Sequence, residues 1–256
     1  MISCYWFNGW TNAGDVFTSY LLRQMGVEYE FNNEHPNFVA TGSILTVPFI
    51  NNDTKIWGSG FIKATNDISH INTSNVYAVR GKLSKNILKC ENCAVGDPGL
   101  LASKVSTLPH ITKQWKYGII PHMIDKPFLG ELEYPNNTHI IDICTDDFNH
   151  LFEEILSCEF IISSSLHGII FAHSFGIPAF HIICNETVPT IDDFKFKDYY
   201  SIWSIPYFAK RVLTAEDLKF AEFDLMSRHS ELFCPSSAEL NTICDSLMMA
   251  FPFPKE

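Results

Sequence analysis

The chain has 256 residues, of which 46% are hydrophobic and 18% are charged, and its formal net charge is −11. This length and composition allow one large packed domain or two small ones, and they exclude a wholly disordered chain. The negative charge argues against nonspecific binding to nucleic acid or to an anionic membrane, although a small cationic pocket is compatible with it.

The N-terminal segment MISCYWFNGW has no basic region and no cleavage site, and no apolar run approaches about 20 residues. We therefore expect neither a secretory signal nor an integral membrane segment. Cys90 and Cys93 form a lone CxxC pair without a second pair or a nearby histidine, so we expect no metal site. These features favour a reduced cytoplasmic protein.

Short apolar segments and helical patterns alternate along the first half of the chain. The apolar segments 3–7, 38–41, 55–57 and 76–79 have the composition of strands. Helices are expected from Asp15 to Gly26, over 82–89 and over 98–105. Asp15 and Asp97 are the predicted N-caps, and Pro98 suits a first helical position.

The pattern restarts after about residue 112. Strands are predicted over 117–120, 138–143, 160–162 and 179–184, and helices over 147–156, 166–175 and from 194 onward. Leu240, Ile243, Cys244, Leu247 and Met248 have the spacing of an amphipathic helix. Alternating strands and helices predict an α/β fold with mostly parallel sheets, arranged as two units with a cleft between them.

The sequence SSSLHG at 163–168 is the most informative motif. It lies between a predicted strand and a predicted apolar helix, where free helix N–H groups face a ligand. An anion such as a phosphate suits this place. His167 is alternatively a capping or core histidine, but three preceding serines favour ligand binding.

Other polar residues follow the predicted strands and each has a plainer alternative. Arg80 follows a buried strand, so we expect its guanidinium to bind phosphate or carboxylate oxygens instead of lying on the surface. Asp15 and Asp97 are alternatively plain caps, His122 a loop residue, and Lys195 a solvated lysine. Because carboxyl ends of parallel strands share one edge, these residues are expected to line one crevice.

Five motifs carry a family resemblance. NAGDVFTSYLL, VRGKLSKNIL, GDPGLL, GIIPH and ISSSLHGIIFAHSFGIP occur in this order, followed by FKFKDYYS, between about residues 11 and 203. In type and order they resemble the polysaccharide pyruvyl transferases. Many members have Arg at the position of Ser165, so this chain lacks one cation of the usual motif.

The resemblance implies a GT-B-like fold of two Rossmann-like domains facing a central cleft. Residues 1–112 are expected on the acceptor side and residues 113–235 on the donor-phosphate side, with a C-terminal helix and tail at 236–256. The implied reaction transfers pyruvate from phosphoenolpyruvate, a co-substrate, to a sugar or lipid-linked glycan as a ketal, with no cofactor. The implied location is the cytoplasm or the inner surface of the membrane.

The candidate site residues fall into two groups. His167, Arg80 and Asp15 are the candidate catalytic residues. The donor is assigned to Arg80, Ser164, Ser165, Leu166, His167, Gly168 and Lys195. The acceptor is assigned to Asn12, Asp15 and His122.

Two other functions are compatible with the same fold. One is a glycosyltransferase that uses a nucleotide sugar, for which Glu186 is the candidate ribose-binding residue. The other is a non-catalytic glycan- or phosphate-binding relative, an alternative that Ser165 in place of Arg keeps open.

Overall fold

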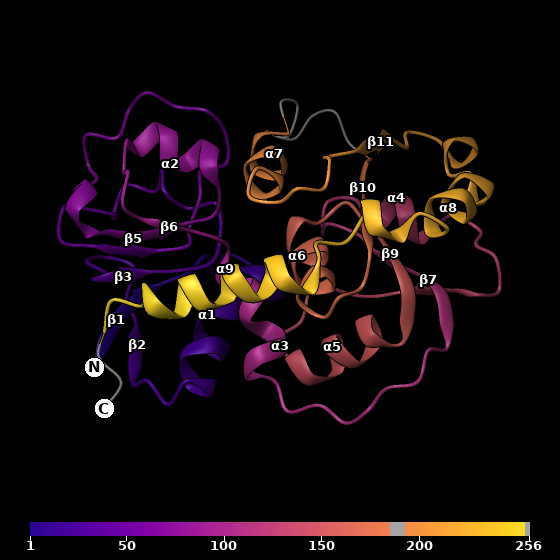
Figure 1. Cartoon of the computed structure of the whole chain (residues 1–256), viewed down its shortest axis with the longest axis horizontal. Helices are drawn as coiled ribbons and strands as arrows, with labels where there is room; N and C mark the ends of the chain where they lie inside the picture. Colours follow the sequence, from indigo (N-terminus) through magenta and orange to yellow (C-terminus); the bar gives the residue numbers. More distant parts are fainter. Residues whose placement is uncertain (185–192, 254–256) are drawn as a thin grey trace.

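The computed structural model describes residues 1–184 and 193–253, and it contains two separate parallel sheets (Figure 1). The first sheet has the order β2-β1-β3-β4-β5-β6 and the second the order β11-β10-β9-β7-β8. All the pairings are parallel. The strands are β1 (Ile2–Tyr5), β2 (Tyr29–Phe31), β3 (Phe38–Val39), β4 (Lys55–Trp57), β5 (Val76–Val79), β6 (Ala94–Val95), β7 (Trp115–Ile120), β8 (Thr138–Ile140), β9 (Cys158–Ser163), β10 (Ala179–Ile183) and β11 (Ala209–Arg211).

Helices connect these strands. The α-helices are α1 (Ala13–Gln24), α2 (Lys82–Leu88), α3 (Ala102–Val105), α4 (Lys126–Gly130), α5 (Phe148–Leu156), α6 (Leu166–Ser174), α7 (Phe194–Tyr200), α8 (Phe220–Ser227) and α9 (Ser237–Met249). Short 3-10 turns are η1 (Thr73–Asn75), η2 (Pro98–Leu101), η3 (Ala215–Asp217) and η4 (Ser230–Leu232). The predicted α/β class with two Rossmann-like units is confirmed. The strands of the two sheets fall on either side of residue 112, and the domain boundary there stays a prediction.

The start of α1 differs from the prediction. Asn12, and not Asp15, is the N-cap, and its side-chain oxygen accepts the N–H of Gly14 at 3.0 Å. The helix begins early because the N–H of Ala13 donates to the carbonyl of Ile143, in the second half, at 2.8 Å. Asp15 therefore lies in the first turn of the helix, and its carboxylate does not cap the helix. The predicted cap at Asp97 is confirmed, because its side chain accepts the N–H of Gly99 at 2.9 Å.

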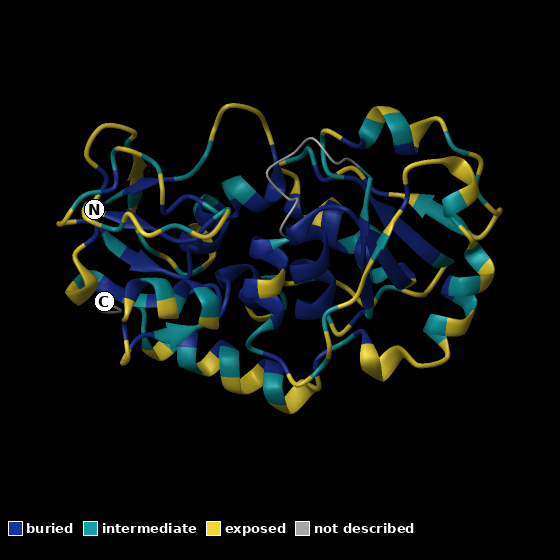
Figure 2. Cartoon of the chain, turned by 90° about the horizontal axis from the view of Figure 1, so that it is seen from above, coloured by how far each residue is buried: buried dark blue, intermediate teal, exposed yellow. Residues whose placement is uncertain are grey.

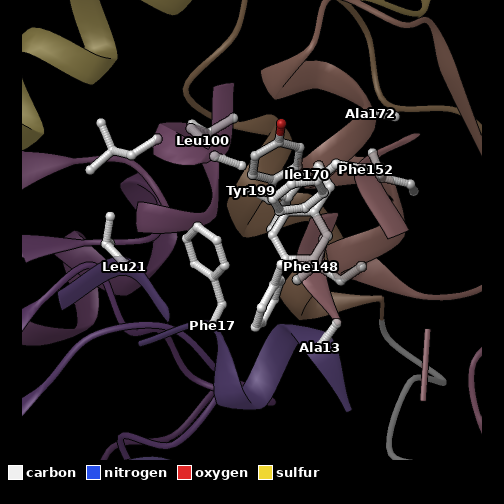
Figure 3. Packing of buried hydrophobic residues seen from close by; sticks show 14 of the residues in the cluster. Ala13, Phe17, Leu21, Leu100, Phe148, Phe152, Ile170, Ala172 and Tyr199 are labelled. Atoms are coloured by element: carbon white, nitrogen blue, oxygen red, sulfur yellow. The ribbon is translucent and has the colours of Figure 1, made fainter. Parts of the chain in front are cut away.

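One hydrophobic core joins the two halves. Phe17 of α1 packs against Phe148 and Phe171, with ring centroids 5.5 and 5.2 Å apart, and the packing of this cluster is shown in Figure 3. Helix α6 lies in the middle of this core, and all nine of its residues are buried (Figure 2). An apolar helix without a polar face is expected in such a place. The junction is thus packed below the carboxyl ends of the strands.

Helix α9 returns from the second half to the first (Figure 1). The indole N–H of Trp57 donates to the carbonyl of Leu247 at 2.8 Å, and the ring of Phe251 lies 5.0 Å from that of Trp57. The Cys244 thiol donates to the carbonyl of Leu100 at 3.4 Å. The last helix, which follows the second half in the sequence, therefore packs against the first half.

Helices α2 and α7 form a second contact between the two halves. Gly81, which precedes α2, lies against α7, and a Cβ at this position would lie 1.8 Å from the carbonyl oxygen of Asp198. Only a residue without a side chain allows this approach. Gly130, at the end of α4, has no atom within 4 Å of the same position.

We expect Gly81→Ala to lower the free energy of unfolding by about 1–3 kcal/mol, because the methyl group must displace backbone. Gly130→Ala is the matched control and should stay within about 0.5 kcal/mol of the parent. Urea unfolding followed by circular dichroism measures both. Equal stability of the two variants would contradict the close contact between α2 and α7.

Candidate active site at the carboxyl ends of the two sheets

The turn between β9 and α6 is held by the hydroxyl of Ser163. Its oxygen accepts the N–H of Ser165 at 3.0 Å and donates to the carbonyl of Ile120 at 2.8 Å. Gly168 packs on this hydroxyl, since a Cβ there would lie 2.5 Å from it. Gly168 is therefore needed for close packing at the start of α6.

The first turn of α6 has free hydrogen-bond donors. Within the described residues, the N–H groups of Leu166, His167 and Gly168 have no acceptor, and the side chain of the N-cap residue Ser165 makes no capping bond. The positive end of the helix dipole adds to these groups. This helix start is therefore suited to an anion.

His167 projects from the same turn and lies between the two halves. A Cβ on Gly14 of α1 would lie 2.0 Å from Nδ1 of His167, so the ring packs directly on this glycine. Nε2 lies 3.8 Å from Oδ2 of Asp97. Burial lowers the pKa of His167 to about 3, and the charges of Arg80 and Lys195 contribute. The imidazole is therefore neutral when no anion is bound.

Lys195, on α7, is a buried cation without a direct partner. It is 9% exposed, and its ammonium makes no hydrogen bond or ion pair with any residue in 1–184 or 193–253. The ring of Phe196 lies 5.3 Å from Nζ. Burial, with the charge of Arg80, lowers the pKa of Lys195 to about 8, and the carboxylates of Asp15, Asp125 and Asp193 oppose this.

The acidic side of the site comes from α1. Asp15 is half-buried, and burial raises its pKa to about 6 while the charge of Lys195 acts in the opposite direction. Its Oδ1 lies 3.8 Å from the position of a Cβ on Gly42. Asn12 is held at the start of the same helix by its capping bond.

The loop after β7 brings His122 to the same place. The backbone N–H of His122 donates to the hydroxyl of Ser164 at 2.8 Å, and the ring Nδ1 of His122 accepts the backbone N–H of Ile124 at 3.4 Å. Burial, with the nearby charge of Lys195, lowers the pKa of His122 to about 4. Lys195 thus acts electrostatically on groups from both halves of the molecule.

The guanidinium of Arg80 is fully buried and bound within the protein. Nε and Nη2 lie 3.1 and 3.0 Å from Oδ2 of Asp198, on α7. Nη1 donates to the hydroxyl of Ser43 and Nη2 to the carbonyl of Phe61, both at 2.5 Å. Arg80 and His167 belong to one electrostatic cluster, but most of the Arg80 donors already have acceptors.

Asp198 was not among the residues predicted for the site. Besides Arg80, it accepts the backbone N–H and the hydroxyl of Ser84 at 2.8 and 2.6 Å, and it is fully buried. The only signal was its place in FKFKDYY, three residues after Lys195. Glu186, the residue considered for ribose binding, lies outside the described residues.

The described residues include no group of three or more His, Cys, Asp or Glu side chains arranged to hold a metal ion. None of the helices in the described part of the chain is both long and apolar enough to cross a membrane.

Comparison with known proteins identifies the family. Residues 12–186 match the family model of polysaccharide pyruvyl transferase, so the chain belongs to that family. It is also 36% identical over 209 residues to "Uncharacterized protein L143" of Acanthamoeba polyphaga mimivirus, covering 76% of this chain and 71% of the viral protein. The search found no significant match among solved structures.

We expect Asp198→Asn to lower the free energy of unfolding by about 3 kcal/mol, because it leaves the buried guanidinium of Arg80 without its counter-charge. The double variant Arg80→Met/Asp198→Leu should lose less free energy of unfolding than the sum of the losses in Arg80→Met and Asp198→Leu, since no charge is then left unpaired. Urea unfolding of the wild-type protein, the three single variants and the double variant gives the five free energies that are needed. Additive effects would contradict a direct ion pair.

Proposed function

We propose that the protein transfers pyruvate from phosphoenolpyruvate to two hydroxyls of a surface or exopolysaccharide sugar, or of its precursor, as a ketal. Family membership supports a transferase of this kind. The observation that carries the proposal is the ammonium of Lys195, which has no partner within residues 1–184 and 193–253 and is buried in one electrostatic cluster with His167 and Asp15. All eight cysteines are free, which agrees with a cytoplasmic location.

The donor is an anion at two places, its phosphate and its carboxylate. We assign these groups to Lys195, to the free N–H groups of residues 166–168 and to the hydroxyls of Ser164 and Ser165. Lys195 supplies a cation that Ser165 cannot. Binding an anion here costs little reorganisation, because the helix start is already fixed by Ser163.

Arg80 attracts the anionic donor by its charge, and it also positions Lys195. At least three of its five N–H groups are used by Asp198, Ser43 and Phe61. The ion pair with Asp198 holds α7, and Lys195 lies one helical turn before Asp198 on that helix. Arg80 therefore positions the lysine that we assign to the donor.

The acceptor is placed on the side of α1. Asp15 is the candidate base for the attacking hydroxyl, with Asn12 and His122 as hydrogen-bonding partners for the sugar. A carboxylate with a raised pKa is a stronger base than an exposed one, so burial suits this role.

The reaction balances as follows. C3 of the donor gains a proton, C2 forms bonds to two sugar oxygens, and its bond to the phosphate oxygen breaks. The two hydroxyls release two protons, of which one matches that gained at C3 and the other leaves with phosphate or solvent. His167 is the candidate acid for C3. Burial is the main cause of its low pKa, and a bound dianion offsets the additional effect of the charges of Arg80 and Lys195.

The pH dependence of kcat/KM tests the assignment of Asp15 and Lys195. Asp15 must be ionised, so activity should fall as the pH drops through about 6, and Lys195 must be charged, so activity should fall as the pH rises through about 8. Lys195→Gln removes the cation that lowers the pKa of Asp15. It should therefore move the acidic limb to higher pH and abolish the alkaline limb. An unchanged profile would contradict the assignment.

The reaction itself is tested with phosphoenolpyruvate and a panel of glycans, by phosphate release and by product mass. The expected product gains the mass of pyruvic acid less water. His167→Ala and Lys195→Gln should each reduce turnover by at least ~100-fold. Lys197→Gln, an exposed lysine on the same helix, is the matched control and should keep wild-type turnover.

Two outcomes would overturn the proposal. Turnover of a nucleotide sugar, with none of phosphoenolpyruvate, would make the protein a glycosyltransferase. Binding of phosphoenolpyruvate without product for any acceptor would make it a binding protein of the same fold.

A further inference from the structure

Two buried polar atoms face each other without partners beside the proposed donor site. Nε2 of His167 and Oδ2 of Asp97 are both inaccessible to solvent, and neither has a hydrogen-bond partner in the described structure. They lie 3.8 Å apart, which is about 1 Å too far for a hydrogen bond. Burying such groups unsatisfied is unfavourable, and groups of this kind at an active site point to a function.

The loop that carries Asp97 is built to hold this carboxylate in place. Oδ1 accepts the N–H of Gly99 at 2.9 Å, so the cap uses only one of the two oxygens. Gly96 has a φ of +147°, in a region that side chains rarely adopt. Pro98 packs against Gly58, where a Cβ would lie 2.2 Å from the proline ring. The second oxygen is left facing His167.

His167 is held from its other side. Its Nδ1 edge lies on Gly14, while the side chain is 11% exposed in total. Since Nε2 itself is inaccessible, the exposed part lies elsewhere on the ring. Of the two nitrogens, Nε2 therefore faces the protein interior, and Nδ1 lies against Gly14 on the side of α1.

We propose that Asp97 is a positioning residue that keeps a proton on Nε2 of His167, so that Nδ1 is the nitrogen available to the reaction. This inference rests on the proposed function for the role of Nδ1, but not for the pairing itself. The pair closes to hydrogen-bond distance when donor binds, as long hydrogen bonds of free enzymes commonly do. The carboxylate also supplies negative charge for the imidazolium, in a site that contains Arg80 and Lys195.

The choice of nitrogen can be measured without substrate. Nitrogen-15 chemical shifts of histidine-labelled protein at pH 7.5 report which ring nitrogen carries the proton, and His167→Gln identifies the signal. The wild-type protein should carry it on Nε2. A neutral ring protonated on Nδ1 in the wild-type protein would overturn the proposal, whatever the fate of any variant of Asp97.

Asp97→Asn separates the two oxygens of this residue. Its side-chain carbonyl keeps the cap on Gly99, and its NH2 group then faces Nε2 as a donor, so the ring proton should move to Nδ1. We expect kcat/KM for phosphoenolpyruvate to fall by at least ~100-fold. Asp147→Asn alters the equivalent cap of α5, where Oδ1 accepts the N–H of His150, and should leave both the proton and the activity unchanged.

A folded Asp97→Asn protein with the wild-type proton position and wild-type kcat/KM would contradict the proposal. If the proton moves as expected but neither protein turns over phosphoenolpyruvate, the pairing of Asp97 with His167 is supported and the proposed reaction fails. The two hypotheses are thus tested separately.

Discussion

The buried ion pair between Arg80 and Asp198 is the interaction on which the site depends. Both side chains are completely inaccessible. Ions are costly to bury unless their remaining donors and acceptors are satisfied, and here Ser43, Ser84 and the carbonyl of Phe61 satisfy them. The pair joins the end of β5 in the first half to α7, which lies between β10 and β11 of the second sheet. It therefore sets where the two halves meet at the carboxyl ends of their strands.

Lys195 is placed by this pair without taking part in it. It lies one helical turn before Asp198, so a helix fixed at Asp198 also fixes the start of the side chain of Lys195. Asp198 compensates the charge of Arg80 and leaves that of Lys195 uncompensated at short range. Among residues 1–184 and 193–253, the two buried basic side chains therefore differ: Arg80 is paired with Asp198, whereas Lys195 has no ion-pair partner there and is the cation that we assign to the donor.

The buried histidines show the same distinction. His173 bonds to the hydroxyl of Tyr199 and the carbonyl of Phe233, and His181 bonds to Tyr207 and stacks on Phe196. His167 is similarly buried, but its Nε2 has no partner within the described structure. Burial is the main cause of the lowered pKa of all three histidines. The unsatisfied nitrogen, facing Asp97, distinguishes His167 from the other two and supports the role that we propose for it.

Most of the fold could be predicted because it depends on local patterns. The runs at 55–57 and 76–79 are bounded by polar or glycine residues and form strands with the predicted bounds, and the mainly apolar α6 lies in the core. Strands β2, β6 and β11 were missed because they are short strands at sheet edges, and β2 and β11 also have exposed residues. Asp198 could not be predicted, because its partner Arg80 lies 118 residues away. Asn12 and Asp15 are equally good caps in sequence, and a bond from Ala13 to Ile143 decides between them.

The most direct test of this account is isothermal titration of phosphoenolpyruvate into the Asp198→Asn protein, at a temperature where circular dichroism shows it folded. If the ion pair places Lys195, the variant should bind phosphoenolpyruvate at least ~10-fold more weakly than the wild-type protein. This loss would be indirect, because the carboxylate of Asp198 already binds Arg80 and Ser84 and is not assigned to the donor. Wild-type affinity in the folded variant would contradict the account.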